Sequence, residues 1–105
     1  MEKYAWSGKI APGAKSEYIK RHSEIWPEMV EALEKAGIRS YTIWNTGDTL
    51  FGYYGCGFGT EFAAKVQSSS EVVKKWDEYM KDILIMDKDP VTGAQPLLEK
   101  VFELD

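Results

Sequence analysis

The chain has 105 residues, of which 44% are hydrophobic and 13% aromatic, so we expect one folded domain over residues 1–105 and not a disordered protein. Thirteen Lys and Arg against 17 Asp and Glu give a net charge of −4 without a basic stripe, which argues against nucleic acid as a partner. No apolar run approaches the roughly 18 to 20 residues that span a membrane, and one cysteine with no signal-like N-terminus favours a cytoplasmic protein.

The N-terminal segment is predicted to form a strand followed by two helices. In residues 3–10 the large side chains of Tyr4, Trp6 and Ile10 fall on one side of an extended chain, and the sequence APG then ends the strand. A helical pattern follows, but Pro27 cannot lie inside a helix. We therefore expect helices at about 13–22 and 24–36, with Pro27 in the first turn of the second and Gly37 as its C-terminal cap.

The middle of the chain is predicted to be a hairpin and the rest a helical region followed by a strand. Residues 38–45 and 49–58 are rich in β-branched and aromatic residues and flank the turn sequence TGD. A short helix is expected near residues 61–66 and a longer one at 71–84, whose apolar face comprises Val72, Val73, Trp76, Met80, Ile83 and Leu84. After a loop containing Pro90, Gly93 and Pro96, residues 97–105 are predicted to form the last strand.

The order strand, helix, strand, strand, helix, strand predicts an α+β protein with the ferredoxin-like split βαβ arrangement and an antiparallel sheet. Both faces of the predicted hairpin are apolar. In the second hairpin strand Leu50, Tyr54, Cys56 and Phe58 oppose Phe51 and Tyr53; in the first, Ile38, Thr42 and Trp44 oppose Tyr41 and Ile43. Since helices cover one face only, we expect a second copy to cover the other in a homodimer.

His22, the only histidine, is the first candidate for chemistry. It lies four residues after Tyr18, so on a helix the two side chains are about 40° apart and share a face. A single histidine on a helix is more often a solvated residue, as we expect for the neighbouring Arg21 and Glu17. Histidine nevertheless titrates near neutrality and can both give and take a proton.

Trp76 and Tyr41 each suit a hydrophobic core as well as a sugar site, in which aromatic rings pack on C–H faces and hydroxyls find polar partners. Metal binding is not expected, because one histidine and one cysteine supply no paired ligands. The sequence DKDPVTG lacks the glycine position and closing glutamate of a calcium loop. The sequence GCGFG lacks the dinucleotide spacing, and Cys56 has no activating neighbour in the sequence.

Five stretches together resemble the L-rhamnose mutarotase family over nearly the whole chain: EYIKRHSEIWPEM at 17–29, YTIW at 41–44, DTLFGYY at 48–54, KKWDEYM at 74–80 and EKVFELD at 99–105. The resemblance implies a homodimeric α/β barrel of ferredoxin-like subunits that interconverts the α and β anomers of L-rhamnose without metal or cofactor. It also implies that His22 is the proton donor and that Tyr18, Tyr41 and Trp76 contact the monosaccharide.

One departure from the family pattern affects the expected site. Well-known members carry two adjacent tryptophans where this chain has Trp76 and Asp77. Asp77 removes a stacking surface and adds a carboxylate that can accept hydrogen bonds from sugar hydroxyls, so we include it among the substrate-binding residues. The preferred sugar, whether L-rhamnose or a related 6-deoxy aldose, is left open by this change, as is the pathway.

The expected mechanism is acid/base ring opening, with His22 protonating the ring oxygen. The general base is left open between Tyr18, a bound water and Asp77. Two alternative functions are a cofactor-free monooxygenase on the same type of dimeric barrel, supported by fold analogy alone, and a non-catalytic sugar-binding module.

Overall fold

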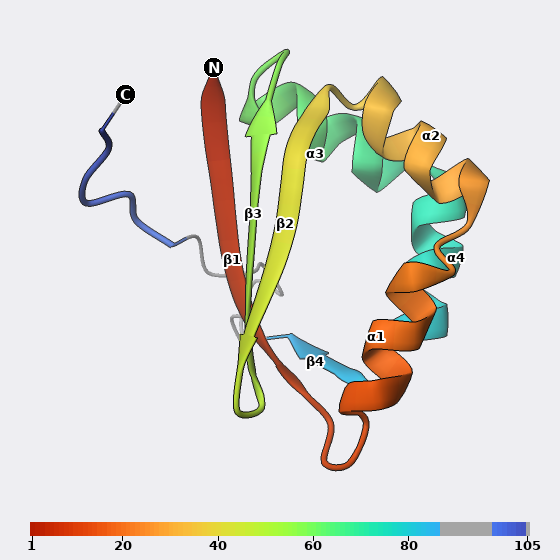
Figure 1. Cartoon of the computed structure of the whole chain (residues 1–105). Helices are drawn as coiled ribbons and strands as arrows, with labels where there is room; N and C mark the ends of the chain where they lie inside the picture. Colours follow the sequence, from red (N-terminus) through yellow and green to blue (C-terminus); the bar gives the residue numbers. More distant parts are fainter. Residues whose placement is uncertain (87–97, 105) are drawn as a thin grey trace, which may run out of the picture.

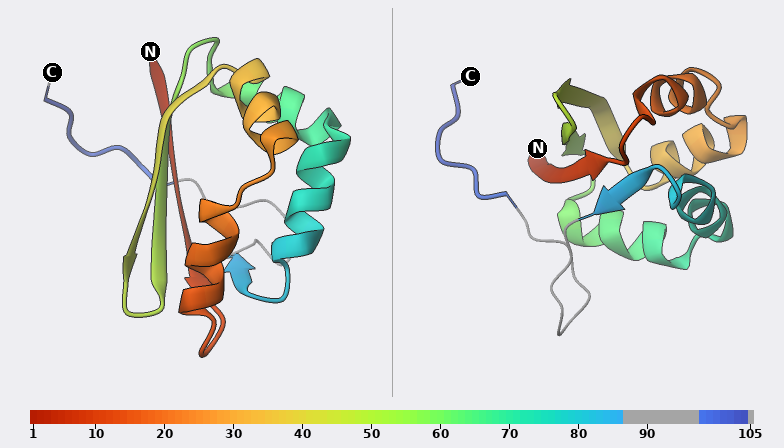
Figure 2. Two further views of the ribbon diagram at one scale, coloured as in Figure 1. Left: turned by 45° about the vertical axis from the view of Figure 1, so that its right-hand side comes forward. Right: turned by 90° about the horizontal axis from the view of Figure 1, so that it is seen from below.

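The computed structural model describes residues 1–86 and 98–104. Its elements, in chain order, are β1 (Glu2–Ile10), α1 (Lys15–Ser23), α2 (Pro27–Lys35), β2 (Ile38–Thr46), β3 (Thr49–Cys56), α3 (Thr60–Ser69), α4 (Glu71–Met80) and β4 (Leu84–Met86). The strands form one antiparallel sheet in the order β2-β3-β1-β4. The helices lie on one side of this sheet (Figures 1 and 2). The predicted α+β class is therefore confirmed.

The division between α1 and α2 follows from local sequence, as predicted. Pro27 is the first residue of α2, and the preceding Trp26 is extended, with φ −62° and ψ 134°. A residue before proline is disfavoured in the helical region, so the chain cannot pass straight from α1 into α2. Gly37 ends α2 with φ +80°, and its N–H donates to the carbonyl oxygen of Glu34 over 3.0 Å.

The C-terminal part of the prediction was wrong. The helix expected over 71–84 ends at Met80, and Leu84–Met86 form β4, which pairs with Gly8–Ile10 of β1. The spacing of Ile83 and Leu84 fits a helix, but the free edge of β1 offers backbone hydrogen bonds to this segment, and pairing with that distant strand prevails over the local preference. Residues 98–104, expected to be a strand, contain none, while the loop with Pro90, Gly93 and Pro96 lies outside the described residues.

An irregularity in β2 changes which side chains face the helices. The pairing with β3 shifts between Arg39 and Thr42, and Ser40 takes a left-handed conformation with φ +52°. Simple alternation had placed Tyr41 and Ile43 on the side opposite Ile38. Because of the bulge, Tyr41 and Ile43 instead line the cavity on the helix side, the side to which the buried Ile38 also belongs.

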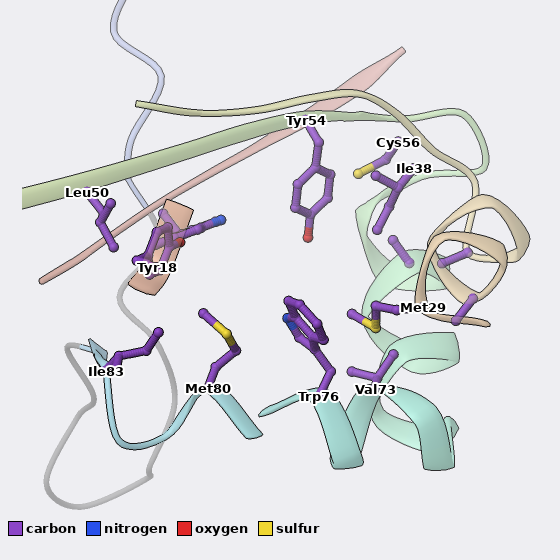
Figure 3. Packing of buried hydrophobic residues seen from close by; sticks show 14 of the residues in the cluster. Tyr18, Met29, Ile38, Leu50, Tyr54, Cys56, Val73, Trp76, Met80 and Ile83 are labelled. Carbon is purple, nitrogen blue, oxygen red and sulfur yellow. The ribbon is translucent and has the colours of Figure 1, made fainter. Parts of the chain in front are cut away.

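Side chains from the inner face of the sheet and from the helices form one core. Figure 3 shows Leu50, Tyr54 and Ile38 projecting from the sheet toward Met80, Trp76 and Met29. In β3 the predicted alternation is confirmed, since Leu50, Tyr54 and Cys56 are buried and Phe51 and Tyr53 are not. Phe58 lies beyond the end of β3 and is exposed.

The outer face of the sheet carries exposed apolar side chains and no helix. Trp44 is 68% exposed, and Phe51, Tyr53 and Ile85 are also exposed. The described C-terminal residues run on this side of the molecule (Figure 1), where the Leu98 N–H donates to the Ala5 carbonyl oxygen. The two-sided apolar pattern of the hairpin is thus present. None of the helices in the described ranges is long and apolar enough to cross a bilayer.

Candidate active site

A cavity of about 1340 Å³ lies between the inner face of the sheet and the helices. Its lining includes the side chains predicted from the sequence to form the site: Tyr18 and His22 from α1, Tyr41 from β2, and Trp76 and Asp77 from α4. The fold therefore brings together residues that are separated by up to 59 positions in the sequence, 77 − 18 = 59.

His22 is held by a hydrogen bond within α1. Its Nδ1 atom lies 3.1 Å from the carbonyl oxygen of Tyr18, and the two rings stack with their centroids 4.4 Å apart. A carbonyl oxygen can only accept, so Nδ1 carries the hydrogen and Nε2 of the neutral ring keeps its lone pair. Burial lowers the pKa of His22 below its usual 6.5, against a smaller opposing effect of the Tyr18 hydrogen bond. At neutral pH the free ring nitrogen is therefore a base.

Trp76 belongs to the core and to the cavity wall at once. It is only 6% exposed, and its ring meets that of His22 edge-on at 5.6 Å. Trp26 packs edge-on against Trp76 at 5.0 Å and lies 5.3 Å from Tyr79. The core position of Trp76 is thus compatible with a place in the cavity wall, while its contact with a sugar stays a prediction. Trp26, which was not predicted as a site residue, supports this wall.

Tyrosine hydroxyls supply hydrogen-bond donors to the cavity. Burial raises the pKa of Tyr18 and of Tyr54 to about 12 and also raises that of Tyr41, so all three stay protonated at neutral pH. This argues against Tyr18 as the general base. Tyr41 accepts a hydrogen bond of 3.0 Å from Nε1 of Trp6 and its ring lies 4.9 Å from that of Tyr54.

Trp6 and Tyr54 were not predicted as site residues. Both had been assigned to the apolar face of a strand, because an aromatic ring at an inward strand position indicates packing and gives no sign of where its polar atom points. What separates these two residues from ordinary core residues is their contact with Tyr41 on another strand. The local sequence does not reveal such a contact.

Arg21 was expected on a solvated face, and this was wrong. Its side chain is 12% exposed and reaches from α1 to the segment after α4. The guanidinium donates to Asp82 over 2.8 Å, to Glu17 over 2.9 Å and to the Tyr79 carbonyl oxygen over 2.7 Å. These bonds fasten α1 to the C-terminal end of α4, and thereby hold His22 beside Trp76.

The described residues include no group of three or more His, Cys, Asp or Glu side chains that could hold a metal ion. Cys56 is buried, and burial raises the pKa of its thiol, which keeps it protonated and unsuited to nucleophilic attack. Two carboxylates, those of the exposed Asp77 and of Glu78, line the cavity next to Trp76. The site therefore offers proton transfer, hydrogen bonding and aromatic packing.

The profile of the L-rhamnose mutarotase family matches residues 3–104 of the chain. A protein of Sinorhizobium fredii named L-rhamnose mutarotase is 40% identical, with 99% of each chain covered. A protein of Paraburkholderia phytofirmans with the same name is 35% identical over all of this chain and 97% of its own. The crystal structure of L-rhamnose mutarotase from Formosa agariphila superposes with a TM-score of 0.80 at 30% identity, with both chains fully covered.

Proposed function

The chain belongs to the L-rhamnose mutarotase family, and from this premise we propose that it interconverts the α and β anomers of L-rhamnose or a related 6-deoxy aldose. The observation that supports this most is the single histidine, whose Nδ1 is bonded to the backbone while the ring lines a cavity walled by tryptophan and tyrosine. The family match favours this isomerase activity over a monooxygenase and over a binding module.

His22 would catalyse ring opening as a relay for one proton. Opening a cyclic aldose breaks the C1–O5 bond, removes hydrogen from the anomeric hydroxyl O1 and adds one to O5, so the net change is transfer of one proton. Nε2 of the neutral His22 takes the proton from O1, and the resulting imidazolium is the proton donor to O5. Rotation about C1–C2 and the reverse steps then give the other anomer.

This relay needs no second titrating group. Tyr18 and Tyr41 act as neutral hydrogen-bond donors to the sugar oxygens, and Trp76 packs on its C–H face. Asp77 acts as an acceptor for a sugar hydroxyl. Of the three candidates for a general base, Tyr18 is disfavoured by its raised pKa, and a bound water or Asp77 would be needed only as an auxiliary group.

We further propose that two copies of this ferredoxin-like subunit pack through their outer sheet faces to form a dimeric barrel. The strand order β2-β3-β1-β4 and the exposed Trp44, Phe51 and Tyr53 support this arrangement. The dimer would leave the cavity with His22 on the opposite side of each sheet. The single buried cysteine, Cys56, suits a reducing compartment such as the cytoplasm.

The activity is tested directly by NMR saturation transfer between the anomeric protons of L-rhamnose. Addition of the protein should raise the exchange rate in proportion to its concentration, without metal or cofactor. A panel of 6-deoxy and ordinary aldoses then defines the preferred sugar. An exchange rate equal to that of buffer for every aldose would contradict the proposal.

A further inference from the structure

The indole ring of Trp6 lies directly on the backbone of the neighbouring strand. Trp6 in β1 is paired with Gly52 in β3. A Cβ atom at Gly52 would lie 2.0 Å from both Nε1 and Cε2 of Trp6, far inside van der Waals contact. The ring can occupy this place only because residue 52 has no side chain.

This placement lets Trp6 reach across the middle strand of three. β3 separates β1 from β2, and the Trp6 ring spans it so that Nε1 comes within 3.0 Å of the Tyr41 hydroxyl oxygen on β2. The bulge at Ser40 is equally necessary, since without the shift in pairing Tyr41 would face the outer side. Trp6 is 7% exposed and Tyr41 is 36% exposed, so the bond is partly buried.

The chemistry of the two groups fixes the direction of the hydrogen bond. An indole N–H only donates, so the Tyr41 oxygen must accept. One acceptor site of the phenol is then occupied, and the hydroxyl hydrogen turns toward another partner. Because burial also keeps the phenol protonated, Tyr41 offers a hydrogen and not a negative charge to the cavity that it lines.

We propose that Trp6 is a positioning residue, which fixes the Tyr41 hydroxyl as a hydrogen-bond donor to an acceptor oxygen of the bound sugar. This rests on the proposed function for the identity of the ligand. Loss of one such bond between neutral groups weakens binding by roughly three- to tenfold. In this role Trp6 acts through Tyr41 and not on the reacting atoms, so kcat should change less than the affinity for the sugar.

The bond itself can be observed without any sugar. In a ¹H–¹⁵N spectrum the indole resonance of Trp6, assigned by its loss in Trp6→Phe, should shift and exchange faster with solvent in Tyr41→Phe. Tyr18→Phe is the matched control, because it removes a tyrosine hydroxyl that lines the same cavity but is not the one bonded to Trp6. The indole resonance of Trp6 should stay in place in this variant. An indole resonance that is the same in Tyr41→Phe and in the wild type would overturn the assignment.

The role in binding is measured by NMR titration with L-rhamnose and by anomer exchange in Trp6→Phe, Tyr41→Phe and the double variant. Each single variant should raise the dissociation constant about three- to tenfold, and the double variant should bind no more weakly than Tyr41→Phe alone. Trp44→Phe, the same replacement on the outer face, is the control for loss of an indole.

The outcomes separate this inference from the proposed activity. Wild-type affinity in Trp6→Phe, or strictly additive losses in the double variant, would overturn the positioning role even if the wild type exchanges anomers. Binding without accelerated exchange would contradict the mutarotase proposal and leave the positioning role to be judged by the dissociation constants. A wild type that does not bind L-rhamnose or any other aldose of the panel would contradict both.

Discussion

His22 and Tyr18 are joined twice: their rings stack at 4.4 Å, and Nδ1 of the histidine donates to the tyrosine carbonyl oxygen over 3.1 Å. The hydrogen bond runs between residues four apart in α1, so the helix itself determines which nitrogen carries the hydrogen. Nε2 is left with its lone pair, which is the state that a proton relay needs at the start of each reaction cycle.

Replacing His22 by alanine should lower the catalysed anomer exchange by about 10²- to 10⁴-fold, the usual contribution of general acid–base catalysis. The measurement is saturation transfer with L-rhamnose, corrected for the rate in buffer. Ser23→Ala is the control, because Ser23 is the exposed neighbour of His22 and, among the contacts described, its side chain bonds only to the Lys20 carbonyl oxygen. This variant should exchange anomers at the wild-type rate. Equal rates in His22→Ala and wild type would exclude the relay.

The pH dependence of kcat/KM follows from the lowered pKa of His22. The neutral ring is the active form, so catalysed exchange should rise with pH through an apparent pKa below 6.5 and be level at neutrality. The unfolded chain binds this proton more readily, so stability should fall as pH drops from about 6.5 toward the folded-state pKa. A rate that instead increases on acidification, after subtraction of the buffer reaction, would mean that the imidazolium is the required starting form.

Replacing Asp77 by asparagine should reduce exchange by less than about tenfold, because the relay through His22 needs no second base and an amide oxygen still accepts a hydrogen bond. Were Asp77 the general base, the loss would instead reach about 10²- to 10⁴-fold. Glu71→Gln, at the exposed start of the same helix, controls for the change of charge.

Replacing Gly52 by alanine should lower the free energy of unfolding by about 1–3 kcal/mol, since the added methyl group overlaps the Trp6 ring and forces it from its place. Gly55→Ala in the same strand is the matched control: its nearest obstacle, the flexible end of Met1, can move away at lower cost. Urea denaturation of both variants measures the difference. Equal stabilities would show that the ring repacks freely.

Replacing Trp44 by aspartate should convert the proposed dimer into a monomer, because a charge would be buried in the apolar outer face, on the edge strand β2. Sedimentation velocity distinguishes the two species. Val30→Asp makes the same kind of change on the helical side, at a partly exposed position, and should leave the dimer intact. A wild type that sediments as a monomer at micromolar concentration would contradict the proposed assembly.

Local rules were sufficient where one residue dictates the backbone. Pro27 lies in the first turn of α2 and Gly37 follows its end, as predicted, because proline and glycine act on their own dihedral angles. The helix begins at Pro27 itself, however, and not at residue 24. The spacing of Tyr18 and His22 likewise put both on one helix face before any fold was known. These predictions depend only on neighbours within about one helical turn.

The features that could not be predicted from the sequence depend on pairing between distant strands. Leu84 continues the apolar face of α4 in the sequence, yet it pairs with Ile10 in β1. Tyr41 faces the cavity because of a bulge in β2, which the alternation of side chains along the sequence does not reveal. The hydrogen bond from Trp6 to Tyr41 depends on the order of the strands in the sheet. The site residues themselves came from the family resemblance, and their roles stay a prediction.

His22 and Trp76 meet edge-on at 5.6 Å, so the fluorescence of Trp76 should report the charge of His22. Indole emission is sensitive to an adjacent cation, which interacts with the ring electrons. Protonation of the only histidine should therefore alter the fluorescence of Trp76 without any label. Comparison with Trp76→Phe identifies the part of the fluorescence that comes from Trp76. An acid titration of this fluorescence then follows the charge of the His22 imidazole, first without sugar and then with sugar bound.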